Sequence, residues 1–324
     1  EEPDADLLLD FDFEGLQGGQ DITTKTASAS GGYTLTTSYD GSQALHLDGT
    51  NTQWLNVTKA DGTSLLTGLD EMTISYDIKN ERDATNWAFF AAPNTTTQEF
   101  GTEHYVGCMH NTGNLTVERY NNTNGRPASA SASVGNDWVH IDVVHSAADT
   151  AIYVNGMESS RVESSYSLKD ILGNNSILQI GKANWTTGEY SQFSMDNLKI
   201  WDKALTTEEI RQQVPATFLE QQMDTIEASI ADVTLEDGQN TLPDYNGTVT
   251  WTSSDLSAIS IAEDGLTAEV QAPGVGEDNL TGKLNGVITL GTLTRPITVD
   301  VTVKAQVGPD DPYGYLMVHF VEDS

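Results

Sequence analysis

Short runs in which apolar and polar residues alternate recur along most of the chain, with residues that favour turns between them. Apolar side chains at every second position are typical of strands that bury one face. We expect strands at residues 7–13, 44–47, 72–78, 87–91, 105–109, 115–120, 138–145, 150–154, 177–180 and 193–201. This spacing predicts an antiparallel sandwich rather than alternating strands and helices.

Two local motifs add a turn and a helix. Asn155-Gly156 directly follows a strand pattern, and both residue types accept the positive φ that a tight hairpin turn requires. Thr206 stands three residues before Glu209, which is the spacing of a capping box. We therefore expect a helix over 206–213, ended soon after by Pro215, and place the first domain boundary there.

A second series of strand patterns begins at Met223. It comprises 226–230, 248–252, 259–261, 267–270, 286–290 and 297–303, with Trp251 expected in its core. Residues 307–314 have the composition of a linker, and 315–320 have the pattern of one more strand. That strand either pairs back onto an existing sheet or begins a further domain. The expected domains are 1–213, 214–306 and 307–324.

Composition narrows the class of protein. The net charge of −33 argues against binding to nucleic acid or to an anionic lipid surface. Hydrophobic residues make up 37%, which is enough for packed cores, but no apolar run is long enough to insert into a membrane. Cys108 has no partner for an intramolecular disulfide and is expected in a buried strand. This acidic, lysine-poor composition is typical of a secreted or cell-surface bacterial protein, and the start at Glu1 suggests a removed leader.

The first domain resembles laminin-G-like domains of the concanavalin A-like class. The resemblance rests on residues 44–49 (ALHLDG), 54–57 (WLNV), 72–79 (MTISYDIK) and, most specifically, 193–206 (FSMDNLKIWDKALT). It implies a concanavalin A-like jelly roll over about residues 5–213. The expected fold class is all-β, with this jelly-roll sandwich followed by a smaller immunoglobulin-like β-sandwich.

The later segments resemble parts of a larger enzyme. Residues 247–255 (GTVTWTSSD) and 298–303 (TVDVTV) are similar to bacterial immunoglobulin-like domains, whose size suits this stretch. Residues 315–322 (YLMVHFVE) are similar to the first strand of a family 43 glycoside hydrolase propeller. Together they resemble the N-terminal accessory region of such an enzyme, which implies a parent acting on arabinose- or xylose-containing polysaccharide.

The first strand pattern suggests a metal site. Asp10, Asp12 and Glu14 alternate with apolar residues and would share one face of a strand, where a hard cation such as Ca²⁺ would relieve their repulsion. The laminin-G resemblance implies a structural calcium between the first and the closing strand. The expected ligands are Asp12, Glu14 and Asp196, with Asp48 as a further candidate. The alternative is a solvated polar face.

Aromatic residues within polar segments suggest a saccharide site. Sugar rings combine an apolar face with a rim of hydroxyl groups, which match aromatic planes and polar side chains respectively. Trp185 is the first candidate, because Asn, Thr and Gly surround it. The other candidates, which we also expect to be exposed, are Trp87, His104, Tyr105, His110, Arg119, Tyr120 and Tyr190. Each of these side chains could instead be structural.

We expect no catalytic residue in this chain. Glucanases of this fold carry Glu-x-Asp-x-x-Glu on one strand, a pattern that this sequence lacks. His140 and His145 lie an odd number of residues apart on one strand and should face opposite sides, so they form a poor metal pair. The expected function is that of a monomeric accessory region that binds polysaccharide or oligosaccharide for a secreted glycoside hydrolase. The alternatives are a structural or adhesion spacer that binds a protein, and a scaffold that packs on the propeller.

Overall fold

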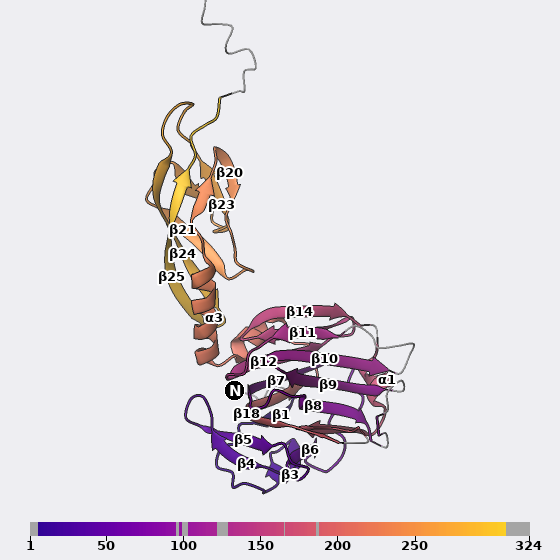
Figure 1. The fold of residues 1–324 in the computed structure, drawn as a ribbon. Coiled ribbons are helices and arrows are strands. Elements are labelled where there is room, and N and C mark those ends of the chain that lie inside the picture. Colours follow the sequence, from indigo (N-terminus) through magenta and orange to yellow (C-terminus); the bar gives the residue numbers. More distant parts are fainter. Residues whose placement is uncertain are drawn as a thin grey trace, which may run out of the picture. The chain divides into compact units, whose positions relative to one another are not determined.

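The structure is a computed structural model that describes residues 6–94, 97–98, 103–121, 129–164, 166–185 and 188–308. The chain divides into two compact units, Glu1–Leu219 and Glu220–Ser324. Strands form most of both units (Figure 1). The strand predicted at 315–320 lies outside the described residues. Among the helices that the structure describes, none is long and apolar enough to cross a membrane.

The first unit contains two large antiparallel sheets, and in the first one β18 pairs with three other strands. The strand order is β14-β13-β12-β7-β18-β5-β4, and β1 also pairs with β18. The strands are β1 (Leu7–Phe11), β4 (Thr34–Thr37), β5 (Gln43–Asp48), β7 (Met72–Asn80), β12 (Val139–His145), β13 (Asp149–Val154), β14 (Met157–Glu163) and β18 (Gln192–Trp201). Strands distant in sequence are therefore neighbours in the sheet, as in a jelly roll.

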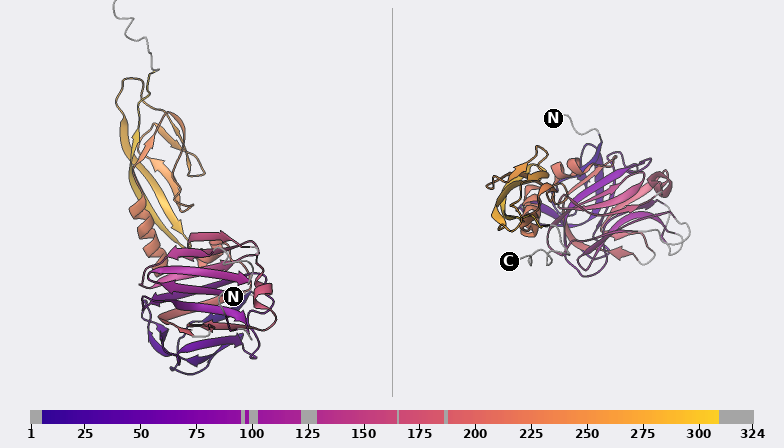
Figure 2. Two further views of the ribbon diagram at one scale, coloured as in Figure 1. Left: turned by 45° about the vertical axis from the view of Figure 1, so that its right-hand side comes forward. Right: turned by 90° about the horizontal axis from the view of Figure 1, so that it is seen from above.

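The second sheet has the order β11-β10-β9-β8-β15-β6-β3-β2. Its strands, which can be followed in Figure 2, are β2 (Ile22–Thr23), β3 (Ala27–Gly32), β6 (Trp54–Lys59), β8 (Asn86–Pro93), β9 (His104–Asn111), β10 (Asn114–Asn121), β11 (Ala130–Ser133) and β15 (Ser176–Ile180). The predicted all-β, concanavalin A-like sandwich is confirmed for this unit.

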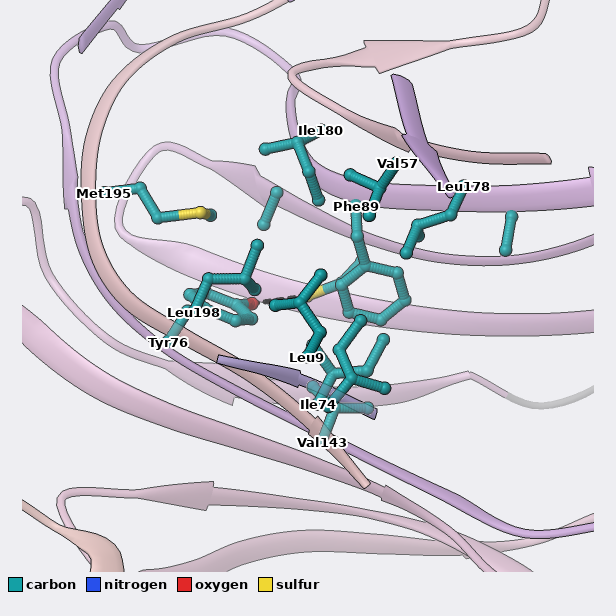
Figure 3. Close-up of a cluster of buried hydrophobic side chains, with 14 of the residues drawn as sticks. Leu9, Val57, Ile74, Tyr76, Phe89, Val143, Leu178, Ile180, Met195 and Leu198 are labelled. Atoms are coloured by element: carbon teal, nitrogen blue, oxygen red, sulfur yellow. Dashed lines mark hydrogen bonds between the residues drawn. The ribbon is translucent and has the colours of Figure 1, made fainter. Parts of the chain in front are cut away.

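The main core lies between the two sheets. Ile74, Tyr76 and Val143 of the first sheet and Phe89 and Leu178 of the second sheet contribute to it (Figure 3). Each is at most 1% exposed, as expected for one apolar face of an alternating strand. Cys108 is buried in the same core, where burial raises the pKa of its thiol to about 12, so it is the inert strand residue that the sequence predicts.

The predicted local motifs are present. Asn155 and Gly156 have φ of 49° and 81° and join β13 to β14. Helix α2 (Thr207–Gln213) begins with the Thr206–Glu209 capping box, in which each side chain bonds the other residue's main chain. A further short helix, α1 (Leu168–Leu172), buries three apolar side chains and is absent from the sequence prediction.

The strand predicted at 226–230 is wrong, because helix α3 (Ala216–Ser229) occupies this segment. Helix α2 ends at Gln213, shortly before Pro215, as predicted. The carbonyl of Pro215 accepts hydrogen bonds from the N–H groups of Phe218 and Leu219 and so begins the next helix. Leu219, Met223 and Ile226 are buried and lie four and three residues apart, which is a helical spacing.

The second unit contains a four-stranded and a three-stranded sheet. Their orders are β19-β25-β24-β21 and β20-β23-β22, with β19 parallel to β25. The strands are β19 (Val233–Leu235), β20 (Gly238–Thr241), β21 (Val249–Ser254), β22 (Ile259–Ile261), β23 (Thr267–Val270), β24 (Leu280–Leu290) and β25 (Leu293–Val303). Trp251 is 2% exposed and donates its Nε1–H to the carbonyl of Pro243, so its predicted core position is confirmed. The immunoglobulin-like assignment stays a prediction.

Candidate functional site

The second sheet of the first unit carries an aromatic cluster on the face that points away from the main core. Strand alternation produces it: Phe89 and Val106 enter the main core, whereas Phe90 and Tyr105 point outward. We call it the outer-face cluster. Its buried members are Trp87, Phe90, Ala92, Tyr105, Tyr120 and Ala183, and Met109, Ile177 and Trp185 pack against them half-buried.

Ring packing makes this cluster rigid. Phe90 and Tyr105 stack with centroids 4.9 Å apart, and Tyr120 meets Tyr105 edge-on at 5.1 Å. Trp185 meets the edge of Tyr105 at 5.5 Å. The hydroxyl groups of Tyr105 and Tyr120 both donate to the carboxylate of Glu118, so the polar ends of these buried rings are satisfied. The outer face therefore holds a small second core.

The expectation that Trp87, Tyr105 and Tyr120 are exposed is wrong, because they are 2%, 0% and 3% exposed. A hairpin of β16 (Lys182–Ala183) and β17 (Glu189–Tyr190) packs on β8, and Ala183 enters the cluster. The indole N–H of Trp87 donates to Glu189 of this hairpin. The composition of this segment is that of a loop, so no sequence pattern predicts that it covers these rings.

His110 and Arg119 face the opposite way and are also buried, at 1% and 3% exposure. They share the parity of Cys108 and Val117, which belong to the main core. Burial lowers the pKa of His110 to about 3, and Arg119 donates to the carbonyls of Ser146 and Asp149 at 2.9 and 3.2 Å. The expectation that His110 and Arg119 are exposed beside a ligand surface is wrong. Side chains alternate along β9 and β10, and these two lie on the faces of their strands that point into the main core.

The half-buried aromatic side chains are the ones that a ligand can reach. Trp185 and Tyr190 belong to this group, and His104 is half-buried at the start of β9. The sequence prediction missed Trp54, which is half-buried in β6 at a position that alternates with the core residues Leu55 and Val57. That alternation was the available signal for its outward direction.

Lys182 joins these rings. Its ammonium group lies 4.3 Å from the centroid of the Trp54 ring and 5.9 Å from that of Tyr190. The Tyr190 carbonyl accepts a 2.6 Å hydrogen bond from Arg82, and the Asn184 carbonyl accepts one of 2.8 Å from the N–H of Gln98. These contacts anchor the hairpin at both ends, so the positions of its side chains are defined.

Polar groups adjoin the rings on the same sheet. A hollow of about 150 Å³ is lined by the amides of Asn56, Asn94 and Asn175 and by hydroxyl groups that include Thr58. Asn56 lies two residues from Trp54 in β6 and therefore shares its outward face. Rings, amides and hydroxyl groups are the side chains that match the two aspects of a sugar.

The carboxylates predicted to bind calcium do not share one strand face. β1 ends at Phe11, and Phe13 has φ of 57°, so Asp12 and Glu14 follow the strand in a turn. Asp12 accepts a hydrogen bond from the N–H of Glu14 at 3.1 Å. The predicted burial of Leu9, Phe11 and Phe13 is confirmed. The expectation that Asp10, Asp12 and Glu14 line one strand face is therefore wrong.

Two of the predicted ligands meet one turn between β4 and β5. Glu14 accepts from the N–H of Gln43 at 2.6 Å, and Asp196 accepts from the hydroxyl of Ser42 at 3.2 Å. Burial, the largest effect, raises the pKa of Asp196 to about 6. Asp48 pairs with Gln192, four residues along β18 from Asp196, or about 13 Å at about 3.3 Å per residue.

The fit of these residues to a metal is incomplete. Within the part of the chain that the structure describes, no group of three or more His, Cys, Asp or Glu side chains is placed to hold a metal ion. Asp12, Glu14 and Asp196 already accept hydrogen bonds from protein groups, and Asp48 is remote. Calcium binding therefore stays a prediction, and no function is derived through it.

A second polar cluster lies on the outer face of the first sheet. His140 Nδ1 is 2.6 Å from Asp77 Oδ1, and His140 Nε2 is 3.3 Å from Asp142 Oδ2. The three side chains are at most 2% exposed. Although burial alone lowers the pKa of His140, the carboxylates of Asp142 and Asp77 raise it to about 10. The ring of Phe218, 6.1 Å from that of His140, packs beside the cluster, so its role is structural.

His145, on the same strand, is buried without an ion pair in the described structure. Its exposure is 0%, its Nδ1 lies 3.0 Å from the Thr150 hydroxyl, and burial lowers its pKa to about 3. The opposite directions of His140 and His145 follow from their odd spacing. The prediction that they face opposite sides of β12 is confirmed.

Comparison with known proteins identifies a family. The sequence profile of the concanavalin A-like lectin/glucanases superfamily matches residues 48–211. No curated protein sequence matches the chain. Solved structures of similar fold include domain 4 of AbnA, a GH43 extracellular arabinanase from Geobacillus stearothermophilus, in complex with arabinotriose. It is 16% identical, with a TM-score of 0.43, over 64% of this chain and 98% of that domain.

Two further structures of similar fold come from other organisms. The CBM40 of the Ruminococcus gnavus IT-sialidase, bound to α2,3-sialyllactose, is 12% identical with a TM-score of 0.38, over 44% of this chain and 81% of its own. The heptameric SAP-like pentraxin of Limulus polyphemus is 16% identical with a TM-score of 0.39, over 60% of this chain and 84% of its own.

Proposed function

Because this chain belongs to the concanavalin A-like lectin/glucanases superfamily, we propose that its first unit is a non-catalytic module that binds carbohydrate on the outer face of the second sheet. The observation that carries the proposal is the set of half-buried rings of Trp54, Trp185 and Tyr190, which adjoin the outer-face cluster and the amide-lined hollow. An aromatic plane covers the C–H face of a sugar, and amide groups bond its hydroxyl rim.

The rigidity of the outer-face cluster supports this role. Trp185 packs on Phe90 and Tyr105, with ring centroids 6.5 and 5.5 Å away, and its main chain is tied to Gln98. A ring that is fixed before binding loses little conformational freedom when a ligand arrives. The interaction energy of the ring and the sugar is then available for affinity.

The wider role that we propose is that of an accessory region. In this proposal the chain belongs to a secreted bacterial glycoside hydrolase that acts on polysaccharide, and the second unit positions the binding module. Attachment of a binding module raises the local concentration of polymer at the enzyme without any new chemistry. The sequence similarity of 315–322 to a family 43 propeller strand supports this part of the proposal.

Replacement of Trp185 tests the binding site. The purified chain and its Trp185→Ala variant would be run in affinity gels containing arabinan, xylan or other plant and host polysaccharides. We expect retention of the wild type by at least one polymer and a loss of about tenfold or more in affinity for the variant, since stacking of one ring contributes about 1–3 kcal/mol.

Trp138→Ala is the matched control, because Trp138 is also half-buried but packs against Tyr39 beside the first sheet. Its retention should equal that of the wild type, and both variants should melt cooperatively. Equal retention of wild type and Trp185→Ala on every polymer would contradict the proposed site. Absence of retention on all polymers and of binding to an oligosaccharide array would contradict the proposed function.

A further inference from the structure

Lys182 occupies an unusual position on the face just described. It opens β16, directly opposite Tyr190 of β17, and its ammonium group lies over the Trp54 ring of β6. The two rings come from different elements, so the ammonium group is held against the sheet rather than extended into solvent. The cation is attracted to the faces of both aromatic rings.

No carboxylate neutralises Lys182 among the residues that the structure describes. Lys59 and Lys79 also lack an ion pair among the described residues, but both are exposed, whereas Lys182 is half-buried. Glu189, on the neighbouring strand, accepts instead from the indole of Trp87. Lys182 therefore differs from these lysines because it is partly removed from water without an acidic partner.

The protein environment makes this ammonium group receptive to an anion. Partial burial lowers the pKa of Lys182, with no contribution from a nearby charge. A half-buried cation has lost part of its hydration, and two aromatic faces replace that hydration incompletely. An oxygen anion that reaches the ammonium group would restore this stabilisation through a charged hydrogen bond.

We propose that Lys182, between Trp54 and Tyr190, binds the carboxylate of an acidic sugar, so that the ligand of this face is a uronic-acid-containing saccharide. This inference rests on the proposed carbohydrate-binding function and specifies its substrate class. A uronic acid carries a carboxylate on the same ring that presents an apolar C–H face. One such residue can therefore stack on an aromatic ring and pair with Lys182 at once.

The neighbouring surface suits a longer chain of sugars. Asn56 lies next along the outward face of β6 after Trp54, and it opens the amide-lined hollow. The net charge of −33 does not prevent the approach of an anion, because charges beyond about 8 Å are screened at physiological ionic strength. Contacts at short range decide the affinity, and Lys182 supplies the attractive one.

Matched pairs of ligands test the proposal. The chain would be titrated by calorimetry with trigalacturonate and with its fully methyl-esterified form, and likewise with glucuronosyl-xylotriose and with its methyl ester. Within each pair the saccharide differs in its carboxylate charge. We expect the acidic member of at least one pair to bind about tenfold more tightly, which corresponds to the lower end of a charged hydrogen bond.

Substitution of the lysine separates its charge from its bulk. Lys182→Gln should remove the preference for the acidic member of the pair. Lys59→Gln is the control, since Lys59 is an exposed lysine at the end of the same strand as Trp54. It should keep the preference. Thermal melting of both variants would establish that each is folded.

The outcomes distinguish this inference from the proposed function. Equal affinity for acidic and neutral members in both pairs, or a preference that survives in folded Lys182→Gln, would overturn the role of Lys182. If neutral oligosaccharides then still bind and depend on Trp185, the carbohydrate-binding function stands alone. If neither acidic nor neutral saccharides bind, the proposed function itself fails.

Discussion

His140 allows the electrostatics of the first unit to be tested directly. Its imidazole ring lies between Asp77, at 2.6 Å, and Asp142, at 3.3 Å, and both carboxylates are fully buried. Apart from His140, the Asp142 oxygens have no hydrogen-bond partner among the described residues, so the histidine provides their compensation. In a His140→Gln variant, two buried carboxylates lose the positive charge between them. Removal of one member of a buried ion pair destabilises a protein by about 3–5 kcal/mol.

The pH dependence of this loss follows from the pKa of His140. After the opposing effect of burial, Asp142 and Asp77 still raise it to about 10 in the folded protein, against about 6.5 in an unfolded chain. A raised pKa of a base stabilises the fold fully below the unfolded value, and this stabilisation is lost as the pH rises through the folded value. The difference corresponds to a stabilisation on the order of 5 kcal/mol below pH 6, which should decline toward zero above pH 10.

Urea denaturation at pH 6, 8 and 10 would measure this decline. Tryptophan fluorescence reports mainly on the first unit, because Trp251 is the one tryptophan of the six that lies outside it. The difference in unfolding free energy between wild type and His140→Gln should be largest at pH 6 and smallest at pH 10. A difference that is constant over this range, or that grows with pH, would refute an imidazolium between the two aspartates.

His145→Gln provides a control, because its effect on the unfolding free energy should change with pH in the opposite direction. Burial lowers the pKa of His145 to about 3, so this residue is neutral in the folded protein and gains a proton on unfolding below about pH 6.5. Its presence therefore destabilises the fold as the pH falls from about 6.5 toward 3. The loss caused by His145→Gln should shrink on acidification, whereas the loss caused by His140→Gln should shrink toward alkaline pH.

Three further predictions concern single features of the first unit. If calcium binds, the melting midpoint should rise in millimolar Ca²⁺ relative to a chelator, and Asp196→Asn should abolish this response; identical melting curves of the wild type would contradict calcium binding. Gly156→Ala should destabilise by about 1–2 kcal/mol, because φ is 81° there and a Cβ would lie 3.3 Å from Val214; unchanged urea midpoints would count against the strained turn. Thr206→Ala should cost about 1 kcal/mol through loss of the helix cap, as measured by urea denaturation, and Thr206→Ser should restore stability.

Sequence patterns predicted the strands well where alternation and burial coincide. β22 and β23 have the predicted ends, and Leu9 and Phe11 of β1 enter the core as expected. The strand pattern at 226–230 is misleading, because it is the end of a longer helical pattern. Leu219, Met223 and Ile226 follow the period of a helix. A short apolar run fits a strand and a helix equally well, and only the spacing over a longer stretch of sequence distinguishes the two.

The candidate sites depend on register, which the sequence does not specify. Asp77 and His140 are directly paired across β7 and β12, and their spacing along the chain gives no indication of this contact. Lys182 lies over Trp54 in an arrangement where β16 pairs with β17 and both strands pack on β8. Such contacts between distant residues depend on tertiary packing. A sequence pattern therefore predicts the face of the strand on which a residue lies, but not the residue that it contacts.

The outer-face cluster connects the stability of the first unit with its proposed function. Tyr105 is buried and contacts Phe90, Tyr120 and Trp185, so its ring supports both the sheet and the accessible tryptophan. Trp185 is half-buried at the edge of the same cluster and supports no other ring beyond Phe90 and Tyr105 in the described structure. Truncation of Tyr105 should therefore reduce stability and saccharide binding together, whereas truncation of Trp185 should reduce mainly binding. If loss of Trp185 reduces saccharide binding without reducing stability, the binding surface takes its shape during folding and not when the ligand binds.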